Sequence, residues 1–252
     1  MASAFHSKAL KLLNLEGVPD SAAVEELQAR GRELGIRFPA SFIDWYGMRD
    51  GIELLKRHSN SDEPIAIGKL GERVYVTRTR DTLREEGVLP FMIESQSVCL
   101  WGLRLDGTDD PPVVVAVDPK YQWSQCSDHF STFIASQLWD YHEVFGETDK
   151  ILVQAQDVQL RADDLKFLRE HFTERTTTHG WPGDHQYRFE RETIRIVIWD
   201  AAGQADWWIA APDEERLTQA LDELLNCGGL KKSLWGNDAR GERVLARFKG
   251  ER

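Results

Sequence analysis

Cysteine is scarce in this chain of 252 residues, where only Cys99, Cys126 and Cys227 occur. The number is odd and no CxxC pair is present, so we expect neither a disulfide framework nor a cysteine zinc site. The chain has no run of about 18 apolar residues, and its N-terminal segment is too charged to form the apolar centre of a signal peptide. We therefore expect a cytoplasmic protein without a membrane partner.

Sequence motifs of the common catalytic and cofactor sites are also missing. The chain contains no GxSxG, no P-loop, no HExxH and no GxGxxG set between a strand and a helix. We accordingly expect no catalytic residue, no metal and no cofactor.

Positive charge is in deficit. Lys and Arg total 31 against 42 Asp and Glu, which gives a formal net charge of −11. Binding to phosphate backbones needs clustered Lys and Arg. The composition therefore disfavours direct binding of nucleic acid and favours a basic protein as partner.

What the chain does contain is an ordinary globular composition, with 41% hydrophobic and 29% charged residues. Single cores stop growing near 250 residues, so this length allows one large domain or two small ones. The polar stretch GETDK at 146–150 marks the boundary that we expect. We predict a first domain over residues 1–146 and a second over residues 151–252.

The first domain reads as two helices, a short third helix, a strand-like segment, three further strands and a closing helix. Asp20 and Gly35 mark the ends of the second helix, and Pro39 begins the third. Ser127 is the expected cap of the closing helix. The predicted ranges are helices at 5–15, 20–34 and 39–47, strands at 74–77, 88–93, 97–105 and 113–117, and the closing helix at 127–145.

The second domain reads as a small α+β unit of unknown type. A helix is expected over residues 162–172, and Asp213 caps a second one whose leucines face inward. Between them, residues 187–200 and 205–211 form the two arms of a β-hairpin that turns at Ala202-Gly203.

Several signals between residues 20 and 145 occur in an order known from one protein family. Residues 33–39 (ELGIRFP) are similar to an E-x-x-LG-x-x-LP segment, and the aromatic residues Phe42 and Tyr46 precede an Asp50-Gly51 turn. The segments LPFM, SVCLWGLRLD and PPVVVAVD follow, and SDHFSTFIASQL is similar to a closing S-F-x-x-F-L helix. In these features the chain resembles the Smi1/Knr4 (SUKH) superfamily. Phe38 and Asp50 stand where Leu and Asn are commoner, and the last hundred residues lie outside the resemblance.

The resemblance implies an α+β fold with a mixed, curved sheet flanked by helices. Members often act as bacterial immunity proteins against secreted toxins, many of them nucleases, and fungal members are scaffolding regulators of cell-wall signalling. No catalytic residues come with the resemblance.

Most of the net negative charge lies in the part that resembles SUKH. Residues 1–146 hold 15 Lys and Arg against 22 Asp and Glu, a formal charge of −7. Within them Asp106, Asp109 and Asp110 lie on one short loop beside Pro111-Pro112. This loop is a candidate for binding the basic surface of a toxin domain, and a solvated loop without a partner is the alternative.

Two adjacent tryptophans, Trp207 and Trp208, lie in the second arm of the predicted hairpin. Neighbouring strand residues face opposite sides of a sheet, so one of the pair is expected to point outward or to cover a helix. An exposed Trp is a favoured anchor for a protein partner. Packing in the core is the alternative for both.

Two further clusters contain residue types that occur in metal sites or in catalytic sites. His179, Asp184 and His185 share one loop, but a zinc site needs three or four convergent ligands and nothing nearby supplies the rest. Cys126 has Asp128 and His129 as neighbours, yet neighbours at a helix start rarely bring a base to a thiol. We expect a solvated turn with a packed Trp181 at the first cluster, and at the second a cysteine that serves as a small apolar residue near a helix cap.

Three functional hypotheses follow. The first is an immunity-type protein that binds a toxin domain and blocks it by steric cover and by acidic groups that mimic phosphate. The second is a regulatory scaffold without a toxin partner. The third is an enzyme with its site near His179–His185.

Overall fold

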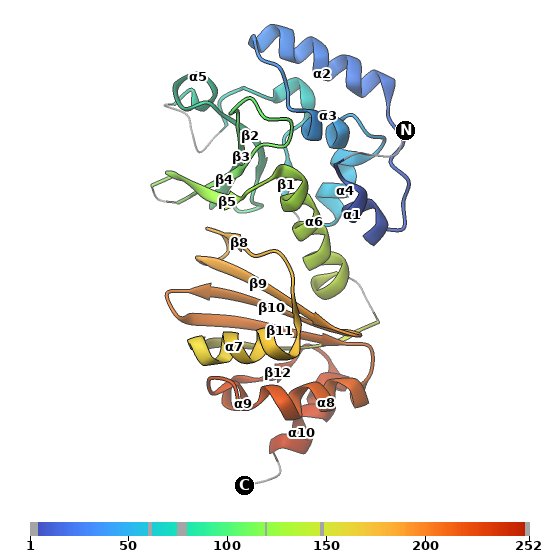
Figure 1. The fold of residues 1–252 in the computed structure, drawn as a ribbon, viewed down its shortest axis with the longest axis vertical. Helices are drawn as coiled ribbons and strands as arrows, with labels where there is room; N and C mark the ends of the chain where they lie inside the picture. The colour runs from blue at the N-terminus through green and yellow to red at the C-terminus, as the bar shows by residue number, and fades with distance from the viewer. Residues whose placement is uncertain (1–4, 60–61, 75–79, 119, 147–148, 250–252) are drawn as a thin grey trace. The chain divides into compact units, whose positions relative to one another are not determined.

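The computed structural model describes residues 5–59, 62–74, 80–118, 120–146 and 149–249 (Figure 1). The chain divides into two compact units, Met1–His142 and Glu143–Arg252. The division falls a few residues before the predicted boundary at Gly146, because Glu143 forms ion pairs with Lys150 and Arg195 of the second unit. That residues 1–146 fold without the remainder of the chain stays a prediction.

The first unit combines short helices with one sheet (Figure 1). Its elements are α1 (Ser7–Leu12), α2 (Ser21–Leu34), α3 (Ala40–Tyr46), α4 (Gly51–Arg57), β1 (Glu63–Pro64), the 3-10 helix η1 (Ile67–Lys69), α5 (Thr82–Glu86), β2 (Val88–Ile93), β3 (Cys99–Arg104), β4 (Val113–Val117), β5 (Trp123–Ser127) and α6 (Phe130–Asp140). The predicted strand at 74–77 lies largely outside the described residues, which resume at Arg80.

The ends of α2 and α3 follow from local signals in the sequence. The Asp20 carboxylate accepts a hydrogen bond from the Ala22 N–H at 2.9 Å and so caps α2. Gly35 ends this helix with φ +69°, a left-handed conformation that glycine adopts without steric cost. Pro39 is the N-cap residue of α3. These predictions are confirmed.

The sheet of the first unit has the strand order β1-β2-β3-β4-β5. The predicted α+β class is confirmed, but the pairing differs from the mixed sheet that the resemblance implied, since each of these strands pairs antiparallel with its neighbour. Residues 94–98 join β2 to β3 and residues 105–112 join β3 to β4, whereas parallel strands need a crossover connection of about a dozen residues or more. The sheet is also open and does not close on itself.

Aromatic side chains from α3, β2 and α6 build the core of this unit. The ring of Phe42 stacks on that of Tyr46 at 4.1 Å, and Phe130 meets Phe91 edge-on at 5.3 Å. The buried hydroxyl of Tyr46 donates a hydrogen bond to the carbonyl oxygen of Phe91 at 2.8 Å. Such ring pairs stabilise a core by about 0.5–1.5 kcal/mol beyond their buried area. These contacts hold α3 and α6 against strand β2 of the sheet.

The predicted cap of α6 is wrong. Ser127 ends strand β5, and its hydroxyl donates to the carbonyl oxygen of His129. The first turn of α6 instead finds its acceptor in the carboxylate of Asp110, which receives the Ser131 N–H at 3.0 Å. A residue distant in sequence thus does what the N-cap side chain usually does.

The second unit has a larger sheet although its chain is shorter. Its elements begin with the π-helical turn η3 (Tyr141–Phe145), which crosses the unit boundary, and continue with β6 (Ile151–Gln159), α7 (Ala162–His171), β7 (Thr173–Glu174), β8 (Thr178–His179), β9 (His185–Arg191), β10 (Ile194–Ala201), β11 (Gln204–Ala211), α8 (Glu214–Leu224), α9 (Leu230–Ser233), β12 (Trp235–Gly236) and α10 (Ala239–Lys249). Seven strands form one antiparallel sheet in the order β12-β6-β11-β10-β9-β7, with β8 paired to β9.

The predicted hairpin turn is confirmed, but the first arm of the hairpin was predicted incompletely. Strands β10 and β11 pair around Ala202-Gly203 as expected. The segment read as one arm, residues 187–200, is itself a hairpin of β9 and β10 that turns at Glu192. Helix α8 begins after its predicted cap Asp213, whose carboxylate accepts the Arg216 N–H at 2.8 Å.

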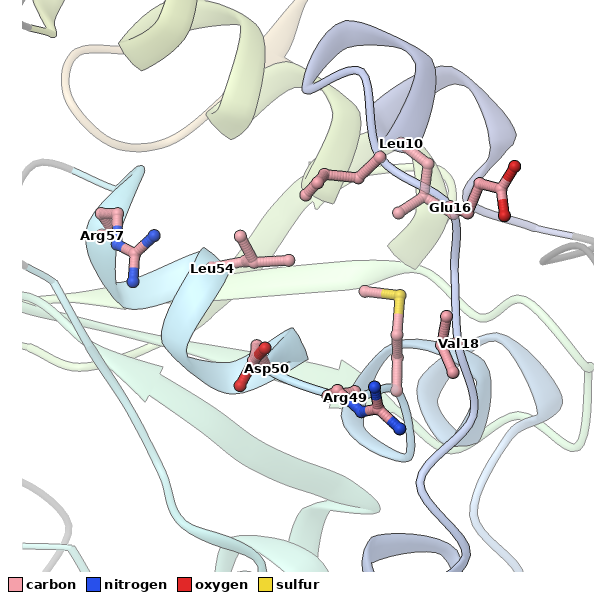
Figure 2. A pocket seen from close by; sticks show the side chains of 9 residues that line it. Leu10, Glu16, Val18, Arg49, Asp50, Leu54 and Arg57 are labelled. Carbon is pink, nitrogen blue, oxygen red and sulfur yellow. The ribbon is translucent and has the colours of Figure 1, made fainter.

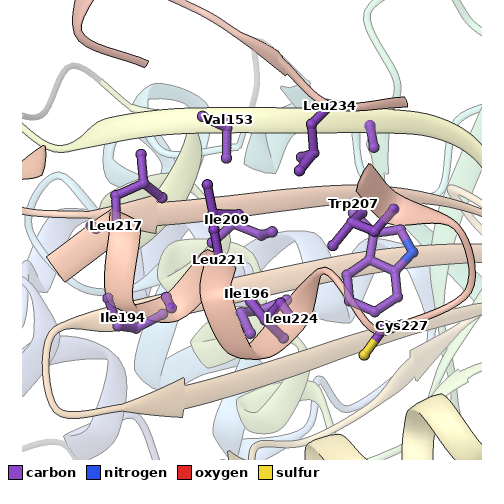
Figure 3. Close-up of a cluster of buried hydrophobic side chains, with 14 of the residues drawn as sticks. Val153, Ile194, Ile196, Trp207, Ile209, Leu217, Leu221, Leu224, Cys227 and Leu234 are labelled. Atoms are coloured by element: carbon purple, nitrogen blue, oxygen red, sulfur yellow. The ribbon is translucent and has the colours of Figure 1, made fainter. Parts of the chain in front are cut away.

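One face of this sheet packs against helices. Figure 3 shows Leu217, Leu221 and Leu224 of α8 lying over the side chains of β6, β10 and β11. The sheet residues labelled there are Val153, Ile194, Ile196, Trp207 and Ile209, all 5% exposed or less. This layer of helix on sheet is the core of the second unit.

Within the described residues, no helix is long and apolar enough to cross a membrane.

Candidate functional site

The acidic loop, residues 105–112, connects β3 to β4 in the first unit. At its tip Asp106 is exposed, and its carboxylate accepts hydrogen bonds from the hydroxyl of Thr108 at 2.6 Å and from its N–H at 3.0 Å. These bonds lower the pKa of Asp106 below its usual value, the side-chain bond contributing most. The carboxylate is therefore fixed in place and stays ionised at neutral pH.

The other end of the loop is attached to two helices. The carbonyl oxygen of Asp109 accepts the Ser41 N–H in the first turn of α3 at 2.8 Å. The carboxylate of Asp110 accepts both the N–H and the hydroxyl of Ser131 in the first turn of α6. Backbone and side chain together hold the loop on the unit, so its shape does not depend on a partner.

The three aspartates therefore have different roles. Asp110 is half-buried and serves the N-terminus of α6. The side chain of Asp109 is 63% exposed and lies 3.4 Å from the guanidinium of Arg37, which is itself 85% exposed. An ion pair with that exposure contributes little to stability. Asp106 and Asp109 are the carboxylates that the loop presents to solvent.

Neither predicted tryptophan is an exposed anchor. Trp207 is fully buried in the helix-covered core, and Trp208 is 7% exposed on the opposite face of the sheet. There the ring of Trp208 lies 4.0 Å from that of Trp199 and 5.4 Å from that of Phe145. The alternation was predicted correctly, but the outward expectation was wrong because this second face carries its own aromatic cluster.

The histidine loop of the second unit forms a half-buried turn, in which Trp181 is half-buried and Asp184 is exposed. The rings of His179 and His185 meet at 5.0 Å, and Nδ1 of His185 lies 3.8 Å from the Asp200 carboxylate. Asp184 points elsewhere, since its carboxylate accepts the Ala202 N–H at 3.0 Å and so ties the loop to the β10–β11 turn. The described residues contain no group of three or more His, Cys, Asp or Glu placed to hold a metal ion.

The candidate thiol and its neighbours do not assemble. Cys126 is 1% exposed, while the exposed His129 places its Nδ1 3.0 Å from the carbonyl oxygen of Asp110. The carboxylate of Asp128 accepts a hydrogen bond from the side-chain amide of Gln125 at 2.9 Å. The base and the carboxylate thus have other partners, and Cys126 is buried in strand β5, as expected of a small apolar residue.

A hollow between α1 and α4 was missed from the sequence (Figure 2). It has a volume of about 250 Å³. We call it the α1–α4 hollow. The residues that line it are Leu10, Leu15, Glu16, Val18, Met48, Arg49, Asp50, Leu54 and Arg57. The available signal was Val18, an apolar residue in the turn-rich segment NLEGVPD that follows the predicted helix 5–15 and lies close in sequence to its last residue, Leu15.

No family model matches this chain, and neither the curated proteins nor the solved structures include one with significant similarity to it.

Proposed function

We propose that this chain is a non-catalytic, protein-binding immunity-type protein of the SUKH kind, which binds and neutralises a cognate toxin domain with a basic surface in the cytoplasm. The observation that carries the proposal is the acidic loop, whose exposed carboxylates Asp106 and Asp109 are held on a fixed backbone.

A fixed loop suits tight and fast binding for two physical reasons. Ordering a mobile loop on binding costs about 0.5–1.5 kcal/mol for each immobilised side chain, and a loop already attached to α3 and α6 avoids part of that cost. Exposed carboxylates on a protein of net charge −11 also steer a cationic partner toward the loop. Facing the basic cleft of a nuclease, they occupy positions that phosphates take in the substrate.

The test is affinity capture with the full chain as bait in extracts of its native cells. Three baits are compared: the wild type, the loop variant Asp106→Asn/Asp109→Asn, and the charge-matched variant Asp163→Asn/Asp222→Asn with both changes on exposed positions of the second unit. We expect the wild type and the matched variant to retain one basic protein in equimolar amount, and the loop variant to retain less.

The captured protein then decides between the hypotheses. A toxin domain whose activity is abolished by one equivalent of this chain supports the immunity function. Capture of a signalling protein with no toxic activity would replace the immunity function by the regulatory scaffold. Equal capture by all three baits would remove the loop from the interface.

A further inference from the structure

The strongest unassigned feature of the first unit is the α1–α4 hollow. Among the described residues, the large hydrophobic side chains that are exposed are Leu15, at 44%, and Val18, at 41%, and both line this hollow. Exposed apolar side chains that gather around a depression mark interaction sites, whereas single scattered ones do not.

The hollow has a firm wall and an apolar floor. Met48 and Leu54 are 6% and 8% exposed, so both side chains are already packed in the core of the unit. The segment that carries Val18 is tied to the residues after α3, because the Val18 carbonyl oxygen accepts the Arg49 N–H at 2.8 Å. A second depression of about 190 Å³ adjoins the first and shares Met48 with it.

Its size favours a side chain of a protein partner over a small molecule. Small-molecule sites have volumes of about 300–1,000 Å³ and enclose most of their ligand. A hollow of about 250 Å³ is smaller and bordered by exposed residues, which suits one apolar anchor inserted from a protein segment.

The two ends of the hollow carry charges of opposite sign. Figure 2 shows Arg57 at one end and Glu16 at the other, with Leu10 and Leu54 between them. Arg49 and Asp50 are sequence neighbours of opposite charge and offset each other on the remaining side. In the part of the chain that the structure describes, neither Arg57 nor Glu16 forms an ion pair. Both ends are thus available to a partner.

We infer that the α1–α4 hollow binds a segment of a partner protein in which one apolar side chain lies between an acidic and a basic residue. The apolar side chain enters the hollow, the acidic residue meets Arg57 and the basic residue meets Glu16. This site goes beyond the proposed function and does not need the acidic loop, from which it differs in charge and in lining.

A displayed library of random ten-residue peptides, selected on the immobilised full chain, tests the inference without a known partner. We expect enriched peptides to share an apolar residue with an acidic residue on one fixed side and a basic residue on the other. Leu15→Asp/Val18→Asp should weaken their binding about tenfold or more. Both side chains are exposed, so these changes should leave the unfolding transition in place, which circular dichroism checks.

Charge reversal separates specific docking from general stickiness. Arg57→Glu should lose the selected peptides and, in a new selection, enrich a basic residue at the former acidic position. Arg32→Glu, the same reversal on an exposed residue of α2 outside the lining, should bind the original peptides unchanged.

Three outcomes would overturn the inference: no peptide that depends on Leu15 and Val18, peptides that bind equally well to Arg57→Glu, or a concentration-dependent dimer of the full chain that Val18→Asp abolishes. The last would show that a second copy covers the hollow. None of these results bears on the acidic loop, so the proposed function stands or falls separately.

Discussion

Two acidic sites, one in each unit, have different surroundings. In the second unit Glu143 is largely buried and lies 2.9 Å from the guanidinium of Arg195, within an ion-pair network. In the first unit the acidic loop leaves Asp109 mostly exposed, 3.4 Å from an Arg37 that is more exposed still. Paired charges hold a structure together, whereas exposed ones in a fixed loop are free to act on a partner.

Apolar side chains show the same contrast. The tryptophans of the second unit pack into two layers, Trp207 beneath α8 and Trp208 against Trp199. The first unit leaves Leu15 and Val18 partly exposed beside a hollow. From this comparison we infer that the first unit carries the binding surfaces. The predictions below test that division.

The largest expected effect is on the core of the second unit. Trp207→Ala should destabilise this unit by about 3–5 kcal/mol, because it removes a fully buried side chain from the layer between helix and sheet. Trp207→Phe should cost less, since it keeps much of the volume and removes an indole N–H that has no hydrogen-bond partner. Amide hydrogen exchange should rise in β9–β11 and stay unchanged in β2–β4. Equal loss of protection in both sheets would contradict the division of the chain into two separate units.

A pH effect of opposite sign is expected in the two units. Burial, and secondarily the nearby Glu94, raise the pKa of Asp62 in the first unit to about 7. Because an unfolded Asp has a pKa near 3.9, the folded state binds the proton more tightly between these values. The free energy of unfolding of this unit should then fall by about 2–4 kcal/mol as the pH rises from about 4 to about 7.

The second unit should behave in the reverse way. Burial opposes ionisation of Glu143, but the hydrogen bonds and charges of Lys150 and Arg195 outweigh it and hold its pKa below the usual value. Its contribution is present above the unfolded pKa and is lost as the pH falls through the folded one. Urea unfolding followed by NMR signals of each unit measures both trends. A first unit whose pH profile matches that of Asp62→Asn would exclude the role of Asp62.

A smaller effect is expected at Gly35. Gly35→Val places a β-branched residue at φ +69°, which should cost about 1–2 kcal/mol although no atom lies within 4 Å of the new Cβ. Gly35→Asn is the control, because Asn tolerates this backbone conformation better. Partner binding should be unaffected by either change. Thermal unfolding compares the variants, and a loss of binding at normal stability would assign this turn to the interface.

The smallest effects separate the aspartates of the acidic loop. Asp110→Ala should destabilise the first unit by about 1 kcal/mol, because the first turn of α6 loses its acceptor. Asp109→Asn should change stability by less than about 0.5 kcal/mol, since its side chain is mostly exposed. Urea unfolding measures both. The reverse order would show that the loop is held differently.

Features with local causes were predictable from the sequence. Asp20, Gly35 and Pro39 set the limits of α2 and α3 through their own backbones and caps. The β9–β10 turn was missed because Glu192, at φ +48°, occupies a position where Gly or Asn would have given a signal. The predicted cap at Ser127 was wrong because the true acceptor comes from a distant loop.

The candidate site was predictable in composition and not in geometry. The clustering of three aspartates beside two prolines is visible in the sequence, but the attachment of Asp110 to α6 depends on tertiary packing. The same holds for Trp208, whose burial depends on Trp199 and Phe145. The α1–α4 hollow joins segments that are separated by α2 and α3, so no local pattern announces it.

Association kinetics with the captured partner test the central claim most directly. The rate is measured against ionic strength for the wild type, Asp106→Asn/Asp109→Asn and the charge-matched Asp163→Asn/Asp222→Asn. Salt screens steering over about 10 Å at 0.1 M, so the wild-type rate should fall steeply as salt is added. The loop variant should associate more slowly at low salt and with a flatter slope, while the matched variant follows the wild type. Equal rates and equal slopes for the two variants would contradict the assignment of the acidic loop to the interface.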